Sequence, residues 1–201
     1  MKVIDLSMPI DERTPVFPGG PKQVIEQLAT IEKTDCNEKR LSFNSHFSTH
    51  MDAPAHMLTN GKTLTDYAVD KFVGECIVLD VRGQKEINAN LDTVNEGDIV
   101  FFFTAHSDKA YDKDYFTTNP VISPKTAQAL VYKKIKMVGL DAPTPDNEPY
   151  TLHKLFFKND ILIVENIVNL KKLAGKRFMC YVLPLKIHKA DGAPCRVIAV
   201  L

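Results

Sequence analysis

The sequence predicts an α/β fold with a mostly β centre, either a mixed sheet or a barrel-like one, flanked by a few helices. Short runs rich in Val, Ile, Leu, Phe and Cys recur along the chain, bounded mostly by Gly, Pro, Asn or Asp. Helix signals are fewer and lie between these runs. Since 201 residues suffice for one domain with a substantial core, we expect a single domain over residues 1–201.

Eight segments are expected to form strands, and two Pro-rich segments are expected to be loops. The loops are Thr14–Pro21 and Asp141–Pro149, because proline fixes the backbone and removes a hydrogen-bond donor. The expected strands are Lys2–Leu6, Arg40–His46, Glu75–Val81, Asp98–Phe103, Lys136–Leu140, Ile161–Val164, Arg177–Leu183 and Arg196–Leu201.

Three segments are expected to be helical. Ser123 followed by proline is typical of an N-cap with proline at the first helical position, and predicts a helix through Tyr132. A second helix is expected from Thr151, as its cap, to Asn159, and a short third one at Asn169–Ala174.

Charge and hydropathy exclude several classes of partner. Lys plus Arg and Asp plus Glu number 25 each, so the chain has no net field to attract nucleic acid or an anionic membrane. No run approaches the roughly 20 apolar residues that span a bilayer. The N-terminal apolar stretch is interrupted by Asp5 and Pro9, so it does not read as a signal peptide. We therefore expect a small-molecule ligand, no nucleic acid and no membrane.

The four cysteines are far apart and form no Cys-x-x-Cys pair, which argues against a zinc ribbon or a redox motif. We expect reduced, buried thiols in a cytoplasmic protein. They are Cys36, Cys76, Cys180 and Cys195.

Three of the six histidines, His46, His50 and His56, fall within eleven residues, and Asp52 lies among them. Imidazole nitrogen and carboxylate oxygen are ligands that zinc and comparable divalent metals prefer, and a catalytic site keeps one position free for water. Clustering at this density predicts a metal site.

The backbone around these histidines is expected to be extended and not helical. The helical metalloprotease motif needs Glu directly after its first histidine, and Phe47 stands there. Leu41 and Phe43 alternate with polar residues in strand fashion, and Pro54 disfavours a helical residue before it. We expect His46 at the end of a strand, with the other ligand candidates on the irregular segment that follows.

Residues 46–56 resemble the signature of the cyclase family of metal-dependent hydrolases, which includes bacterial kynurenine formamidase and isatin hydrolase. The signature His-x-Gly-Thr-His-x-Asp-x-Pro-x-His matches at every fixed position except Ser48, which replaces glycine. Serine fits there unless the backbone needs a positive φ. The resemblance implies the swivelling β/β/α cyclase fold and a homodimer or larger assembly. Further landmarks are Asp5–Ser7, Pro15–Gly19, Gly139–Pro143, Pro184–Lys186 and Ala190–Arg196.

The resemblance also implies a set of metal ligands. His46, His50 and Asp52 would hold a first ion, and Asp52, whose carboxylate has two oxygens, would bridge to a second. In the formamidase branch that second ion is held by a histidine and, twelve residues later, a glutamate. His153 and Glu165 have this spacing. We expect one or two divalent ions, with Zn²⁺ preferred and Mn²⁺ as the alternative.

Two further residues are expected to act on the substrate, His56 because of its position six residues after His50 and beyond Pro54, and Phe17 because of the resemblance. His56 is expected to act as the general acid/base, passing a proton from water to the leaving nitrogen, with metal ligation as its alternative role. Phe17 stands where the formamidase branch has a tryptophan that packs on the aromatic substrate, and this chain has no Trp.

The leading functional hypothesis is a metal-dependent amidohydrolase of the arylformamidase type. Metal-activated water would hydrolyse an aryl formamide such as N-formylkynurenine to formate and the free amine. One alternative opens a cyclic amide or lactone at the same site, as isatin hydrolase does. The other is a non-catalytic protein with structural zinc, which ranks lower because structural zinc sites are usually rich in cysteine.

Overall fold

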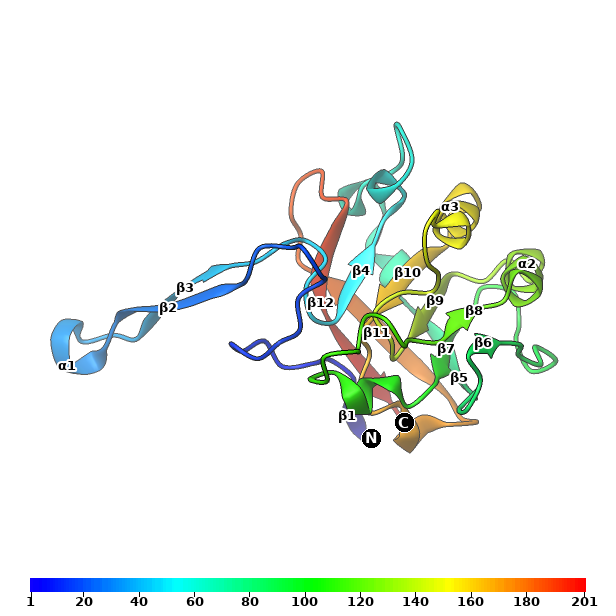
Figure 1. The fold of residues 1–201 in the computed structure, drawn as a ribbon, viewed down its shortest axis with the longest axis horizontal. Coiled ribbons are helices and arrows are strands. Elements are labelled where there is room, and N and C mark those ends of the chain that lie inside the picture. Colours follow the sequence, from blue (N-terminus) through cyan, green and yellow to red (C-terminus); the bar gives the residue numbers. More distant parts are fainter.

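A computed structural model describes all of residues 1–201, and an eight-stranded mixed sheet forms its centre (Figure 1). The strand order is β1-β12-β11-β5-β7-β9-β10-β4, and β12 also pairs with β4, so all strands but β1 form a closed ring. The barrel-like β centre predicted from sequence is confirmed. The strands are β1 Val3–Asp5, β4 His50–Asp52, β5 Val73–Asp80, β7 Ile99–Phe103, β9 Met137–Leu140, β10 Leu162–Glu165, β11 Arg177–Pro184 and β12 Gly192–Val200.

Two helices cover one side of the sheet (Figure 1). α2, Pro124–Tyr132, connects β7 to β9, and α3, Thr151–Lys158, connects β9 to β10. Strands β5, β7, β9 and β10 pair in parallel, whereas the other pairings in this sheet are antiparallel. Parallel strands need such crossover connections. The smaller elements are β2 Val24–Ala29 with β3 Glu38–Ser42, α1 Ile31–Thr34, β6 Glu86–Ile87 with β8 Val121–Ile122, and short 3-10 helices at 54–56, 64–66, 69–72, 106–109 and 170–173.

β7 is buried on both faces, which accounts for its uninterrupted apolar sequence. Ile99, Phe101 and Phe103 belong to the larger core cluster, which draws residues from every strand of the ring. Val100 and Phe102 belong to the second cluster, which includes side chains of α2 and α3. Central parallel strands with covered faces are typically apolar throughout.

The helix predictions are confirmed in position, with two differences at the ends. Ser123 caps α2, its hydroxyl accepting a hydrogen bond from the Thr126 amide at 3.1 Å. Thr151 is not the cap of α3: Tyr150 occupies that position, and the Asp146 carboxylate accepts from the Leu152 amide at 2.6 Å instead. The third helix is a 3-10 turn over 170–173.

The predicted strand Arg40–His46 is wrong over its second half. β3 ends at Ser42, and β4 begins at His50, so His50 and Asp52 lie on a strand and not on an irregular segment. β4 lacks an apolar run, and forms because both of its edges pair with neighbouring strands. β2, Val24–Ala29, was not predicted; it pairs with β3 in a hairpin that projects from the body (Figure 1).

Two other expectations concern membranes and thiols. No helix in the structure combines the length and apolarity needed to cross a membrane.

Cys76, Cys180 and Cys195 are buried as expected, but Cys36 is exposed, because it lies on the projecting hairpin. The cytoplasmic location stays a prediction.

Candidate metal centre

Strand alternation places His50 and Asp52 on the same face of β4. Successive side chains of a strand point to opposite faces, so Met51 points the other way, into the larger core cluster. All three residues are almost completely buried. The side chains of His50 and Asp52 therefore contact the residues that the neighbouring strands place on the same face.

The neighbours of β4 supply an acid and an open space. On β10, Glu165 is the register partner of His50, and paired residues share a face of the sheet. On β12, Gly192 is the partner of Asp52. A Cβ atom at position 192 would lie 2.6 Å from Cε1 of His46, so the absence of a side chain makes room for that imidazole.

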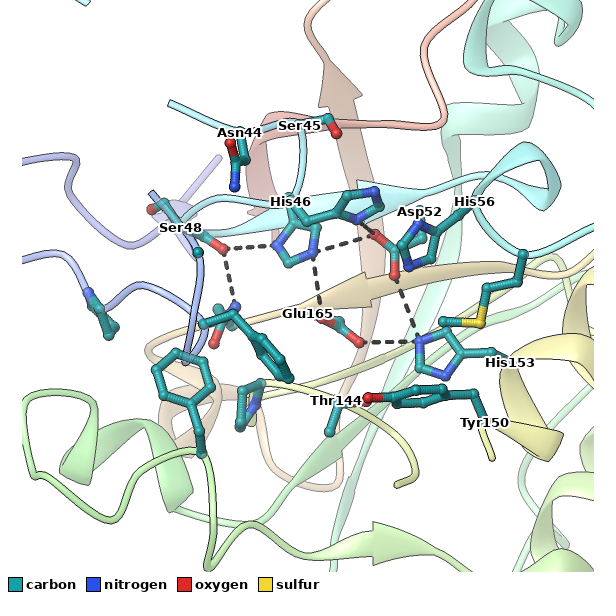
Figure 2. Close-up of a pocket in the computed structure, with 18 residues that line it drawn as sticks. Asn44, Ser45, His46, Ser48, Asp52, His56, Thr144, Tyr150, His153 and Glu165 are labelled. Carbon is teal, nitrogen blue, oxygen red and sulfur yellow. Dashed lines mark hydrogen bonds and ion pairs between the residues drawn. The ribbon is translucent and has the colours of Figure 1, made fainter. Parts of the chain in front are cut away.

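The structure brings the five residues predicted as metal ligands into two groups that share Asp52. Each group has its ligand atoms within 4.8 Å of one another. Asp52 Oδ1 lies 2.7 Å from His46 Nδ1 and 3.2 Å from His50 Nε2, whereas Oδ2 lies 3.8 Å from His153 Nε2. Figure 2 shows Asp52, His153 and Glu165 turned toward one another. Asp52 thus occupies a bridging position.

Glu165 also extends across both groups, a feature that the sequence did not predict. Its Oε2 lies 3.3 Å from His50 Nε2, and its Oε1 lies 3.4 Å from His153 Nε2. The chain therefore offers two bridging carboxylates on one face, each with one oxygen for each side.

Two of the histidines are held by hydrogen bonds at the nitrogen that faces away from the centre. His50 Nδ1 lies 2.9 Å from the Ser48 carbonyl, and His153 Nδ1 bonds the Asp146 carboxylate. In both histidines Nε2 therefore points toward the shared carboxylates. Metal-binding histidines commonly have such partners, which fix the tautomer and orientation of the ring. Asp146 lies in the Pro-rich loop and gave no sequence signal for this role.

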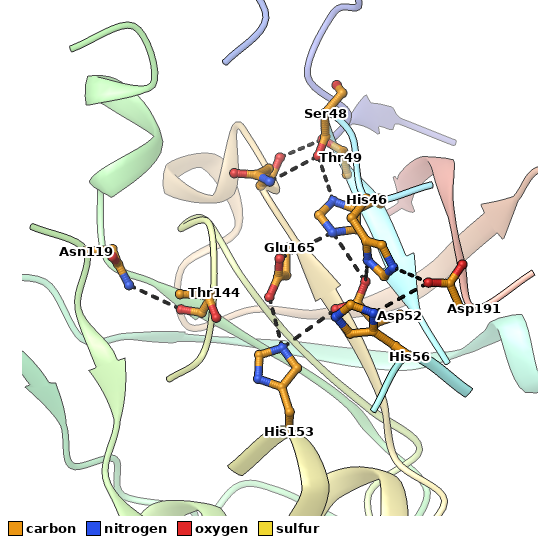
Figure 3. Close-up of polar contacts among 12 residues, drawn as sticks. His46, Ser48, Thr49, Asp52, His56, Asn119, Thr144, His153, Glu165 and Asp191 are labelled. Atoms are coloured by element: carbon orange, nitrogen blue, oxygen red, sulfur yellow. Dashed lines mark hydrogen bonds and ion pairs between the residues drawn. The ribbon is translucent and has the colours of Figure 1, made fainter. Parts of the chain in front are cut away.

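Asp191 provides the corresponding partner for His46 and also reaches His56. Asp191 Oδ2 lies 2.9 Å from His46 Nε2 and 3.5 Å from His56 Nδ1 (Figure 3). The sequence singled out the segment 190–196 only as a landmark, so this contact was missed. Asp191, His46 and His56 also form a group whose ligand atoms lie within 4.8 Å of one another.

The electrostatics of the two groups fit a divalent cation. Burial by itself lowers the pKa of His50 and His153, but Asp52, Glu165 and Asp146 raise it, for His50 well above its usual value and for His153 to about 10. Burial raises the pKa of Asp52, but His46 and His50 hold it well below its usual range. Protons on the imidazoles thus balance buried carboxylates, and a divalent ion supplies the same positive charge in their place.

His56 differs from the other histidines of the site. Burial lowers its pKa, and the neighbouring His46 and His153 lower it further, against the opposite effect of Asp52 and Asp191. His56 closes a 3-10 turn after β4, and its side chain is 28% exposed. A neutral imidazole at the edge of the cluster can accept a proton at neutral pH.

The cluster lies in a pocket of about 490 Å³. Phe17 forms part of its wall, is 54% exposed and contacts Phe116 edge to face, with ring centroids 5.5 Å apart. None of the lining residues is Lys or Arg. The pocket therefore offers an aromatic wall, and the histidines are its only basic side chains.

Ser48 adopts the backbone conformation that favours glycine. Its φ is +58°, so the substitution for the signature glycine carries a conformational cost. The Ser48 hydroxyl donates a hydrogen bond to the Met8 carbonyl at 3.0 Å, which offsets part of that cost.

Comparison with known proteins identifies the family. The Cyclase family model matches residues 4–147. The chain belongs to the cyclase family. The resemblance inferred from residues 46–56 is confirmed.

Three known proteins resemble this chain over nearly its whole length. Kynurenine formamidase of Bacillus anthracis is 30% identical, over 98% of the chain and 96% of the relative. A solved structure of a potential metal-dependent hydrolase with cyclase activity is 28% identical, with a TM-score of 0.83, over 98% of this chain and 96% of that one. An isatin hydrolase bound to thioisatinate has a TM-score of 0.88 at 21% identity, over 100% of this chain and 92% of that one, and shows the shared fold. This cyclase-family chain is a hydrolase.

Proposed function

We propose that this hydrolase is metal-dependent and cleaves the carbon–nitrogen bond of an uncharged aryl formamide, releasing formate and an aryl amine. The observation that carries the proposal is the pair of buried ligand groups that share Asp52, beside a histidine with a lowered pKa in an aromatic-walled pocket. The named formamidase relatives support the same class of reaction.

Two divalent ions fit the donor set. His46, His50 and Asp52 would hold one, and His153 and Glu165 would complete the other together with Asp52. Mixed imidazole and carboxylate donors suit Zn²⁺, with Mn²⁺ as the alternative. Such ions supply Lewis-acid polarisation of the carbonyl and make water a stronger acid.

His56 is the proposed general acid/base. It lines the pocket, and none of the ligand groups places it together with Asp52. Its lowered pKa leaves it unprotonated at neutral pH, and with Nδ1 turned toward Asp191 its Nε2 can take a proton from the attacking water and return it to the leaving nitrogen. Asp191, within 3.5 Å of Nδ1, orients the ring.

The pocket lining supports an uncharged aromatic substrate. Phe17 and Phe116 line the pocket and pack edge to face on each other, whereas no Lys or Arg is present to pair with a substrate carboxylate. Aromatic rings stack favourably on such walls. The flat, uncharged cyclic amide isatin satisfies the same requirements, and its hydrolysis is the second candidate.

The test compares three substrates on one enzyme preparation. Protein stripped with a chelator and reloaded with Zn²⁺ or Mn²⁺ is assayed with formanilide, N-formylkynurenine and isatin. We expect turnover only after reloading, and a higher kcat/KM for formanilide than for N-formylkynurenine. A preference for isatin selects the second candidate. Inactivity of the reloaded enzyme on all three contradicts the proposal.

A further inference from the structure

Asn166 is a buried polar residue to which the proposed reaction assigns no role. It directly follows the bridging Glu165 at the end of β10, and it lines the pocket. Its φ is +57°, a conformation that asparagine adopts more readily than most other residues. Only 7% of Asn166 is exposed. A buried amide needs a partner for its donor and another for its acceptor.

Both ends of the Asn166 side-chain amide have a partner. Nδ2 donates to the Ser48 carbonyl at 3.1 Å, and Oδ1 accepts from the Tyr115 hydroxyl at 2.6 Å. A carbonyl can only accept, so the nitrogen faces Ser48 and the oxygen faces Tyr115. A carboxylate at this position would offer no donor to Ser48, and an aliphatic side chain would pair with neither residue.

The Ser48 carbonyl is also the acceptor that holds a candidate metal ligand. His50 Nδ1 donates to it at 2.9 Å, which leaves Nε2 near the carboxylates of Asp52 and Glu165. A carbonyl oxygen has two lone pairs, one for each donor. The direction of this carbonyl therefore governs the orientation of the His50 ring, and Asn166 is the second group that fixes it.

The backbone of Asn166 is bonded to the same part of the chain. Its carbonyl accepts from the Thr49 hydroxyl at 2.6 Å, and its amide donates to the Ala142 carbonyl at 3.0 Å. Figure 3 shows Ser48 and Thr49 together at one end of the ligand cluster. Because the backbone is fixed, the remaining freedom of Asn166 is rotation of its side-chain amide.

Tyr115 limits that rotation, because its hydroxyl donates to Asn166 Oδ1. Tyr115 is 1% exposed. Its ring stacks on His106, with centroids 4.9 Å apart, and His106 Nε2 bonds the Tyr115 carbonyl at 2.7 Å. Tyr115 neither lines the pocket nor belongs to a ligand group. A substitution at this position therefore reaches the metal centre only through Asn166 or through the packing of the segment.

We propose that Asn166 is a positioning residue for the metal centre, since it fixes the Ser48 carbonyl that orients His50. Tyr115 in turn fixes the Asn166 amide. This inference rests on the proposed function, in which His50 is a metal ligand. Without the Asn166 amide the Ser48 carbonyl retains one donor and can turn together with the His50 ring. Metal–ligand distances tolerate about 0.2 Å, so even a small displacement of the ring weakens binding.

The test measures metal affinity in variants that interrupt this series of hydrogen bonds. Protein stripped of metal is titrated with Zn²⁺ against a chromophoric chelator. Asn166→Leu, which keeps the size of the side chain and loses both bonds, should weaken Zn²⁺ binding about 10- to 100-fold. Tyr115→Phe, which removes one hydrogen bond, should weaken it about 3- to 10-fold. In the Asn166→Leu background, Tyr115→Phe should have no further effect on affinity.

Tyr67→Phe is the matched control. The Tyr67 hydroxyl donates to Asp160 Oδ1 at 2.9 Å, and neither residue lines the pocket or belongs to a ligand group. Metal affinity should be unchanged, although a tyrosine hydrogen bond is lost here too. Circular dichroism and urea unfolding of the stripped proteins verify folding and separate lost stability from lost affinity. If Asn166→Leu does not fold, Tyr115→Phe, which removes a single oxygen atom, decides the question by itself.

Absorption of the Co²⁺-loaded proteins gives a second readout that does not depend on activity. The d–d bands of Co²⁺ respond to ligand geometry, so they should shift in Asn166→Leu and Tyr115→Phe and stay unchanged in Tyr67→Phe. Wild-type affinity and spectra in both the Asn166 and Tyr115 variants would overturn the positioning role and leave the proposed function standing. A wild type that binds neither Zn²⁺ nor Co²⁺ would refute the metal centre itself.

Discussion

Gly192→Ala is expected to abolish tight metal binding, although position 192 contributes no ligand. The added Cβ would lie 2.6 Å from His46 Cε1 and 3.0 Å from Nε2. Ordinary contact begins near 3.4 Å, so the imidazole must retreat by about 0.8 Å from the 2.6 Å position. Metal–ligand distances tolerate about 0.2 Å, and the backbone carbonyl of Met51, 3.0 Å from the same Cβ, prevents the methyl group from moving the other way.

The expected size of the effect follows from this displacement. The displaced His46 no longer reaches the metal at the proper distance and loses its hydrogen bond to Asp191. These losses should weaken Zn²⁺ binding at least 100-fold, or about 2.7 kcal/mol. The metal-free protein should lose about 1–3 kcal/mol of stability, as is usual for overpacked sites. Competition titration with a chromophoric chelator measures the affinity, and urea unfolding of the stripped protein measures the stability.

Gly74→Ala is the matched control. It is also a strand glycine, but the nearest atom to its new Cβ is the flexible Lys136 ammonium at 3.3 Å. Metal affinity should be unchanged. If Gly192→Ala binds metal as tightly as the wild type, then His46 either is not a ligand or is not seated against β12.

Further predictions concern the surroundings of the cluster. Asp191→Asn should weaken metal binding about 10- to 100-fold, because His46 loses its carboxylate partner; unchanged affinity would assign Asp191 no orienting role. Since burial lowers the pKa of His56, wild-type kcat should fall only as pH drops below about 6.5. A His56→Gln variant that retains metal should not show this fall at acidic pH, and its kcat should be about 10²–10⁴-fold lower than that of the wild type. Ser48→Gly should be more stable than Ser48→Ala by about 0.5–1 kcal/mol, because both lose the bond to Met8 but only alanine keeps the strained φ; equal stabilities in urea would refute this. Native protein should react with one equivalent of a thiol reagent, at Cys36, and with four only after unfolding.

Most strands of the ring, and the candidate ligands of residues 46–52, were predictable because their signals are local. Apolar runs such as β7 are buried on both faces and read directly as strands. Residues 46–56 contain three histidines and an aspartate. This density indicates a metal site even when the fold is unknown. His153 was found only through the family spacing, since one histidine on a helix carries no signal of its own.

The parts that the sequence did not reveal depend on tertiary pairing. β4 has one apolar residue, Met51, and exists because β10 and β12 pair with both of its edges. Asp146 and Asp191 are single acids in loops, and nothing in the sequence around them links them to a histidine; Asp191 is also 145 residues from His46, which it contacts. β2 has exposed apolar residues and no regular alternation, so nothing distinguished it from a loop.

Metal stoichiometry in wild type and Asp52→Ala protein tests most directly the proposal that one carboxylate serves two ions. Protein dialysed against excess Zn²⁺ and then against metal-free buffer is analysed by inductively coupled plasma mass spectrometry, and activity is measured on the same samples. We expect two equivalents in the wild type, one in His153→Ala, and fewer than one in Asp52→Ala, with activity lost in both variants. Two equivalents retained by Asp52→Ala, or full activity of metal-free wild type, would contradict the account.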